Sequence, residues 1–207
     1  SVGITLFKGD GVSAEDLMKQ AEIAMYKAKE AGRNAWRFFD PRMESSVKER
    51  ARLESDLRLA LAQQQLLLYY QPQVRGTREL TGAEALIRWC HPERGMVSPL
   101  EFISLAEENG LILPIGQWVL HEACTQLARW AEQPDFCQLT IAVNVSARQF
   151  RQTGFVDQVL GVLAQTGADP HRLKLELTES LLVQDVDQVI EKMSLLGFGA
   201  QWNGKPG

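Results

Sequence analysis

Residues Leu80–Trp89 read Leu-Thr-Gly-Ala-Glu-Ala-Leu-Ile-Arg-Trp, and the rest of the predicted fold is arranged around them. This stretch is apolar enough to form a buried strand, yet it contains Glu84 and Arg88. A buried charge is costly unless it is paired or binds a metal. Because side chains alternate along a strand, Glu84, Leu86 and Arg88 share one face. Such a pair suits a metal-bound phosphate, with the carboxylate holding the cation and the guanidinium the anion. A structural Glu–Arg ion pair is the alternative.

Composition narrows the possible classes of protein. The 207 residues are 45% hydrophobic and 23% charged, which is typical of a globular chain with a core. A net charge of −4 without a basic tract argues against a protein that binds duplex nucleic acid. The three cysteines are widely spaced and lack a CxxC pair, so a zinc site or disulfide framework is not expected and a reducing cytoplasm is favoured. No apolar run approaches the ~20 residues of a membrane span.

Apolar runs of strand length alternate with helical patterns after residue 65. The expected strands are 66–74, 80–89, 139–146 and 173–180, and the expected helices are 98–110, 115–131, 155–165 and 183–195. Residues 92–99 are expected to form a loop. This alternation predicts an α/β fold with a parallel sheet and right-handed crossovers. Upstream, the sequence predicts a strand at 1–6, a helix from Ser13 to about Gly32, and a charged linker helix over 42–65.

Three of the expected strands each carry one misplaced polar residue. These residues are Glu84, Asn144 and Glu176. All three offer oxygen ligands, and this favours Mg²⁺, Mn²⁺ or Ca²⁺ over zinc. In a (β/α)₈ barrel, residues of this kind meet at the mouth formed by the C-terminal ends of the strands. The pattern therefore predicts a cation site at one end of a barrel-like sheet.

The stretch Glu84-Ala85-Leu86-Ile87-Arg88-Trp89 resembles the signature of EAL domains, the cyclic-di-GMP phosphodiesterases. The supporting motifs are Tyr70-Gln71-Pro72, Pro99-Leu100-Glu101-Phe102-Ile103, Asn144-Val145-Ser146 and Glu176-Leu177-Thr178-Glu179. The resemblance implies a TIM-like barrel that hydrolyses one phosphodiester bond of cyclic-di-GMP, giving pGpG. It also implies a cytoplasmic location in a bacterium.

The resemblance also implies roles for individual residues. Glu84, Asn144 and Glu176 would ligate Mg²⁺ or Mn²⁺, and Glu84 would thereby be catalytic. Arg88 would contact the substrate phosphate. Glu179 would belong with Glu84 to the catalytic residues by steadying a mobile loop beside the site, and Gln71 would point into the barrel near the substrate.

The first part of the chain resembles a different family. Ala24-Met25-Tyr26-Lys27-Ala28-Lys29 and Gly32-Arg33-Asn34 are similar to the C-terminal end of GGDEF domains, the diguanylate cyclases. There, the residues that match Lys29 and Arg33 contact the triphosphate of GTP. For this chain the favoured interpretation is that both residues are solvated cations at a helix end. The GGDEF signature itself is absent, so no cyclase activity is expected.

These resemblances divide the chain into four expected parts. They are a GGDEF remnant (1–41), a linker helix (42–65), the N-terminal part of an EAL domain with about four strands of an incomplete barrel (66–197), and a tail that departs from the family (198–207). After Gly197 the family has an Asp-Asp-Phe-Gly-Thr-Gly loop that completes its metal site, and this sequence lacks it. The chain is therefore expected to be inactive by itself.

Three hypotheses follow for the function. The chain could be a phosphodiesterase of the EAL type, a non-catalytic module that binds nucleotide or protein, or a fragment without a stable fold. The expected small-molecule partner is cyclic-di-GMP, and no duplex nucleic acid or membrane segment is expected. An incomplete barrel would leave an open strand edge after residues 173–180, and unpaired edges promote association. Self-association into a homo-oligomer is therefore a further expectation.

Overall fold

A computed structural model describes residues 1–7, 9, 11–32, 34–76, 79–177, 192 and 196. The chain divides into two compact units, Ser1–Asp56 and Leu57–Gly207. In the first unit, β1 (Val2–Ile4) pairs in parallel with β2 (Trp36–Phe38), and α1 (Ala14–Glu30) packs on both strands. Gly3 permits this packing, because a Cβ there would overlap the α1 backbone at Ala21 and Met25.

The ends of the first two helices follow from their local sequences. Ser13 caps α1 as expected, since its Oγ accepts a hydrogen bond from the backbone N–H of Asp16 at 3.1 Å. Helix α2 (Pro41–Ala60) begins at Pro41 and includes the division between the units. It ends at Ala60 rather than at Gln65, because the chain turns over residues 61–64 and Gln64 adopts a positive φ of 55°.

The second unit is built on an open five-stranded sheet in the order β3 (Leu66–Arg75), β4 (Glu79–His91), β6 (Thr140–Val145), β7 (Leu173–Leu177), with β5 (Gly95–Val97) paired to β4. Strands β4, β6 and β7 are parallel, as expected. The expectation of a wholly parallel sheet was wrong for β3, which runs antiparallel to β4. Only residues 76–78 join the two strands, and a parallel crossover needs a dozen or more residues.

The region expected to be a loop at residues 92–99 contains strand β5, which makes a hairpin with β4. The turn is held by His91, whose Nδ1 accepts hydrogen bonds from the backbone N–H groups of Glu93 and Arg94 at 3.1 and 3.2 Å. The turn thus depends on hydrogen bonds between the His91 side chain and the backbone that follows it. The spacing of apolar residues, on which the prediction of a loop was based, does not indicate such bonds. The hairpin extends β4 beyond its contact with β6.

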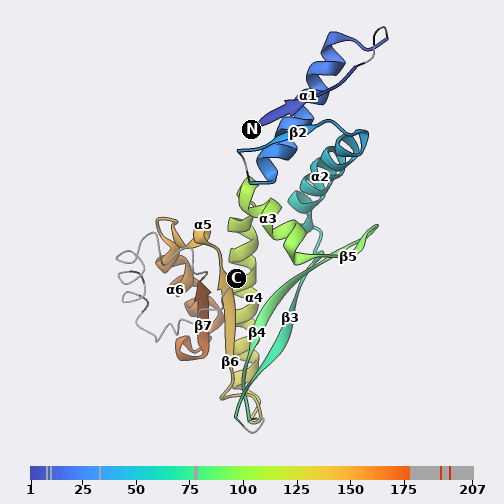
Figure 1. The fold of residues 1–207 in the computed structure, drawn as a ribbon. Helices are drawn as coiled ribbons and strands as arrows, with labels where there is room; N and C mark the ends of the chain where they lie inside the picture. Colours follow the sequence, from blue (N-terminus) through green and yellow to red (C-terminus); the bar gives the residue numbers. More distant parts are fainter. Residues whose placement is uncertain are drawn as a thin grey trace. The chain divides into compact units, whose positions relative to one another are not determined.

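Helices cover the sheet of the second unit, as Figure 1 shows. They are α3 (Pro99–Asn109), α4 (Ile112–Ala131), the short α5 (Ala147–Phe150) and α6 (Phe155–Thr166), followed by the 3₁₀ turn η1 (Pro170–Arg172). Helix α4 contacts both β3 and β6, and it also contacts α5 and α6. The expected helix at 183–195 and the tail 198–207 lie outside the described residues, apart from 192.

Aromatic side chains contribute to the core of the second unit. Trp89 is fully buried, packs edge-on against Phe102, and donates from Nε1 to Oε1 of Gln65 at 3.0 Å. Trp130 is half-buried and packs against Tyr70 with ring centroids 5.7 Å apart. Among the described residues, no helix combines the length and apolar character needed to cross a membrane.

The packing of α4 can be tested through its cysteine. Burial raises the pKa of the Cys124 thiol to about 12, whereas Cys90 is exposed. The thiolate is the reactive form, so at pH 8 the folded chain should alkylate at Cys90 on the order of a thousandfold faster than at Cys124. Mass spectrometry after iodoacetamide treatment measures both rates. Unfolding in urea should make them similar, and equal rates in the folded chain would contradict the packing.

Candidate cation and phosphate site

The register of the sheet places four predicted site residues on one face. Gln71 lies directly opposite Glu84 in the β3–β4 pair, and Asn144 lies opposite Glu176 in the β6–β7 pair. Glu84 is paired with Ala142, which precedes Asn144 by two residues and therefore shares its face. Four strands thus contribute one polar side chain each to the same side of the sheet.

A hydrogen bond joins two of these side chains directly. Nδ2 of Asn144 donates to Oε1 of Glu84 at 2.9 Å, between strands β6 and β4. Glu84 is buried, with 8% of its surface exposed. With Nδ2 donated to Glu84, Oδ1 is the acceptor atom that the exposed Asn144 amide still offers. Hydrogen bonding of this kind fixes the orientation of a ligand before a cation arrives.

Glu176 supplies a direct test of whether a cation fits. Its side chain is 5% exposed, and within the described part of the chain its Oε1 is buried without any hydrogen-bond partner. A buried acceptor without a partner is costly, and each such case needs an explanation. A hard cation would satisfy this oxygen, and the neighbouring amide and carboxylate are also oxygen ligands. The donor set therefore fits Mg²⁺ or Mn²⁺.

The described residues contain no group of three or more His, Cys, Asp and Glu side chains that could hold a metal. The set here has only two carboxylates, and its third member is the amide of Asn144. A site of this kind has fewer negative charges than a carboxylate triad. Among these residues it can hold one cation through three side chains.

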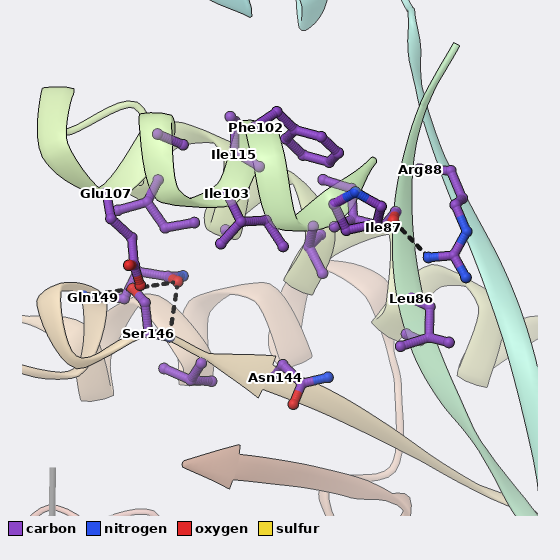
Figure 2. Close-up of a pocket in the computed structure, with 17 residues that line it drawn as sticks. Leu86, Ile87, Arg88, Phe102, Ile103, Glu107, Ile115, Asn144, Ser146 and Gln149 are labelled. Atoms are coloured by element: carbon purple, nitrogen blue, oxygen red, sulfur yellow. Dashed lines mark hydrogen bonds between the residues drawn. The ribbon is translucent and has the colours of Figure 1, made fainter. Parts of the chain in front are cut away.

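The described contacts of Arg88 do not include the structural ion pair with Glu84 that was the alternative for Leu80–Trp89. Nη1 of Arg88 donates to the carbonyl oxygen of Ile87 at 2.9 Å (Figure 2). Its guanidinium carbon lies 5.4 Å from the ring centroid of Tyr69. Among the described contacts of Glu84, the bond is to Asn144 instead. The half-buried guanidinium thus keeps donors for an anion.

A cavity of about 210 Å³ lies beside Arg88 and Asn144 (Figure 2). It begins where β4 and β6 stop pairing, after Ala85 and Val143. Helices α3 and α4 supply apolar walls, including Phe102, while Ser146 and Gln149 line the side next to α5. The volume is below the ~300–1,000 Å³ of pockets that hold a whole small molecule, so it suits one fragment of a larger ligand.

The other predicted residues are placed differently. Gln71 is exposed on the shared face, and Lys29 is exposed in the last turn of α1, in the first unit. Arg33 and Glu179 lie outside the described residues. Tyr70 belongs to the opposite face of β3, against Trp130, and burial together with the nearby Glu122 carboxylate raises its pKa to about 12. It is a packing residue.

Sequence reasoning missed two features of the site. Tyr69 lies under the Arg88 guanidinium, and nothing in the spacing of the two residues indicates that contact. Helix α5, which follows β6 directly, was also missed. Its signal was present, because Ser146 and Gln149 have the Ser-x-x-Gln spacing of a capping box.

An open α/β sheet with oxygen ligands on one face is typical of an incomplete TIM-like barrel. The chain is a member of the EAL domain family. The family model for the EAL domain matches residues 54–200. The model for the diguanylate cyclase GGDEF domain matches residues 1–35. The expected pairing of a GGDEF end with an EAL domain is thereby confirmed.

Curated relatives agree with this assignment. The chain is 43% identical over 203 residues to the bifunctional diguanylate cyclase/cyclic di-GMP phosphodiesterase MucR of Pseudomonas aeruginosa, covering 96% of this chain and 30% of MucR. It is 40% identical over 200 residues to the cyclic di-GMP phosphodiesterase PdeR of Escherichia coli, covering 95% of this chain and 30% of PdeR. The chain thus spans less than a third of these relatives.

A solved structure supports the fold. The MucR phosphodiesterase in complex with c-di-GMP matches with a TM-score of 0.70 and 40% identity, over 75% of this chain and 66% of that chain. The expected α/β fold with an incomplete TIM-like barrel is confirmed. In the described residues the sheet stays open, with β3 and β7 as its edge strands.

Proposed function

We propose that this chain carries the cation-binding and phosphate-binding part of a bacterial cyclic-di-GMP phosphodiesterase. The observation that carries the proposal is the buried Oε1 of Glu176, which has no hydrogen-bond partner among the described residues and lies on the same sheet face as Asn144 and Glu84. The relatives named as cyclic di-GMP phosphodiesterases, and the solved complex with c-di-GMP, support the choice of substrate.

Glu84, Asn144 and Glu176 are the proposed ligands of Mg²⁺ or Mn²⁺. When bound, such a cation supplies charge neutralisation at the phosphate and lowers the pKa of water. The strands that carry these three residues are hydrogen-bonded neighbours, and this arrangement supports the proposal that their oxygens share one cation. Glu179 and Gln71 are proposed to complete the surroundings of the site, as the family resemblance implies.

Arg88 is the proposed contact to a phosphate of the substrate. Its guanidinium is planar, and the Tyr69 ring and the Ile87 carbonyl fix its plane, which favours recognition of two phosphate oxygens together. The apolar cavity beside it would take one flat, partly apolar group of the ligand, such as a base. The remainder of a dinucleotide would lie along the exposed sheet face.

A second function, as a binding module without turnover, is favoured by one observation. The family's Asp-Asp pair should follow Gly197, and residues 198–207 contain no aspartate. Binding needs the groups described above, whereas hydrolysis needs more carboxylates than they provide. We also propose a reducing, cytoplasmic environment, in keeping with the three unpaired cysteines. Self-association through an open strand edge stays a prediction.

The substrate contact can be tested by calorimetry with cyclic-di-GMP in the presence of Mg²⁺. We expect Arg88→Met to weaken binding by at least about tenfold, because it removes charge-assisted hydrogen bonds of ~1.5–3 kcal/mol. Arg75→Met is the matched control, since Arg75 is an exposed arginine at the far end of β3. Equal affinities for the two variants would overturn the role of Arg88.

A further inference from the structure

Helix α5 is fixed to the helices of the second unit by two adjacent side chains. Arg148 donates from Nη1 to the backbone carbonyl oxygens of Glu107 and Glu108, at 2.5 and 3.4 Å, in the last turn of α3. Cationic donors at this position satisfy the free carbonyls of a helix end. The next residue, Gln149, is 8% exposed and contacts α4.

The contact between Gln149 and α4 depends on a glycine. The amide group of Gln149 lies over Gly116, where a Cβ would overlap its carbon, oxygen and nitrogen. Gly116 lies inside α4, in its second turn. Glycine inside a helix lowers stability by ~1 kcal/mol relative to alanine. The close approach of the amide accounts for this unfavourable residue.

The Gln149 amide cannot move away at low cost. Its Oε1 accepts hydrogen bonds from the backbone N–H and the hydroxyl of Ser146, at 3.2 and 2.9 Å. The Ser146 Oγ in turn accepts from the backbone N–H of Gln149 at 3.2 Å, which completes a capping box. Displacing the amide would therefore break the cap at the first turn of α5.

This capped turn follows the candidate ligand Asn144 almost directly. Strand β6 ends at Val145, and Ser146 is the N-cap of α5, so the last residues of β6 are fixed by the turn. The Asn144 side chain keeps its orientation through the hydrogen bond from Nδ2 to Glu84 at 2.9 Å. Binding sites tolerate displacements of only about 0.5 Å.

We infer that Gln149, seated against Gly116, is a positioning residue that orients Asn144 in the cation site. The predicted effect on cation affinity rests on the proposed function. The predicted effect on the orientation of Asn144 does not depend on it. Helix α4 is then part of the site's support, although it contributes no ligand. Loss of the contact between Gln149 and Gly116 should turn Asn144 away from Glu84. It should weaken cation binding by about 10–100-fold, as is usual for partners of metal ligands.

The test compares Gly116→Ala, Gln149→Ala, the double variant and Gly161→Ala. Gly161 is the matched control, since it is also a helical glycine, in α6, but a Cβ there meets nothing within 4 Å. The readouts are the side-chain amide NMR signals of Asn144 without metal, assigned with Asn144→Asp, and Mn²⁺ affinity by calorimetry. Melting temperatures report on stability separately.

We expect the Asn144 signals to move or broaden in Gly116→Ala and Gln149→Ala and to stay in place in Gly161→Ala. The double variant should bind Mn²⁺ like Gln149→Ala alone, because both changes act through the same amide. A fall in melting temperature with unchanged Asn144 signals and affinity in both single variants would overturn the inference and leave a packing role. If Gly116→Ala does not fold, Gln149→Ala decides alone.

The test also separates this inference from the proposed function. Absence of Mn²⁺ binding by the unaltered chain, together with displaced Asn144 signals in the variants, would remove the cation site and keep the positioning role. Mn²⁺ binding that depends on Glu84 but is unaffected by Gln149→Ala would keep the cation site and overturn the positioning role.

Discussion

Replacing Glu176 with methionine should stabilise the cation-free chain by about 1–3 kcal/mol and abolish its stabilisation by Mn²⁺. The first effect follows because the change removes a buried carboxylate oxygen without a partner and keeps a similar volume. The second follows because a proposed ligand is lost, and a ligand present at 100 times its Kd contributes ~2.7 kcal/mol. Urea unfolding in EDTA and in Mn²⁺ measures both.

The matched control is Glu79→Met. It changes an exposed glutamate at the N-terminal end of β4, away from the proposed cation site. This variant should keep the Mn²⁺-dependent gain in stability, and its free energy of unfolding in EDTA should change little. A Glu176→Met protein that is less stable than the unaltered chain in EDTA would show that the buried carboxylate has a stabilising role. The case for a cation at this position would then fail.

The second large effect concerns turnover. We expect the 207-residue chain to release no pGpG from cyclic-di-GMP above background with Mg²⁺ or Mn²⁺. Two-cation hydrolysis of phosphodiesters requires carboxylates that bridge the cations, and the described site offers three ligands without such a bridge. Losing several kcal/mol of stabilisation at the reacting phosphate corresponds to a rate at least ~10³-fold lower.

Chromatographic measurement of pGpG tests this expectation, and the EAL domain of Pseudomonas aeruginosa MucR serves as the positive control. Arg88 can still hold a phosphate in the inactive chain, but binding of the ground state does not by itself accelerate the reaction. Binding without turnover is therefore the expected combination. Steady release of pGpG that disappears in Glu84→Ala would contradict it and would mean that other residues complete the site.

The sequence predicted the shared face of Glu84, Asn144 and Glu176 because two simple rules apply to it. Side chains alternate along strands, and the C-terminal ends of parallel strands lie at one edge of a sheet. Neither rule concerns the packing of distant side chains. The amide of Gln149 over Gly116 and the guanidinium of Arg88 over Tyr69 depend on tertiary contacts, which apolar periodicity does not report.

The errors in the fold have similar causes. The prediction of a parallel sheet came from the alternation of strands and helices along the second unit and did not treat β3 separately. The short connection after Arg75 decides the direction instead, because it permits only a hairpin. Strand β5 was missed because it has only three residues and depends on pairing with Trp89–His91 for its definition. Pairing partners of short strands cannot be read from their own composition.

The distribution of the cation ligands along the chain has a consequence for folding. Asn144 and Glu84 are separated by 60 residues, and Glu176 belongs to a later strand still. Bringing them together in an unfolded chain would require closing long loops at an entropic cost, so the cation has no binding site there. It can bind only after β4, β6 and β7 have paired. Mn²⁺ is therefore expected to slow unfolding more than it accelerates folding, because its site forms only when these three strands have paired.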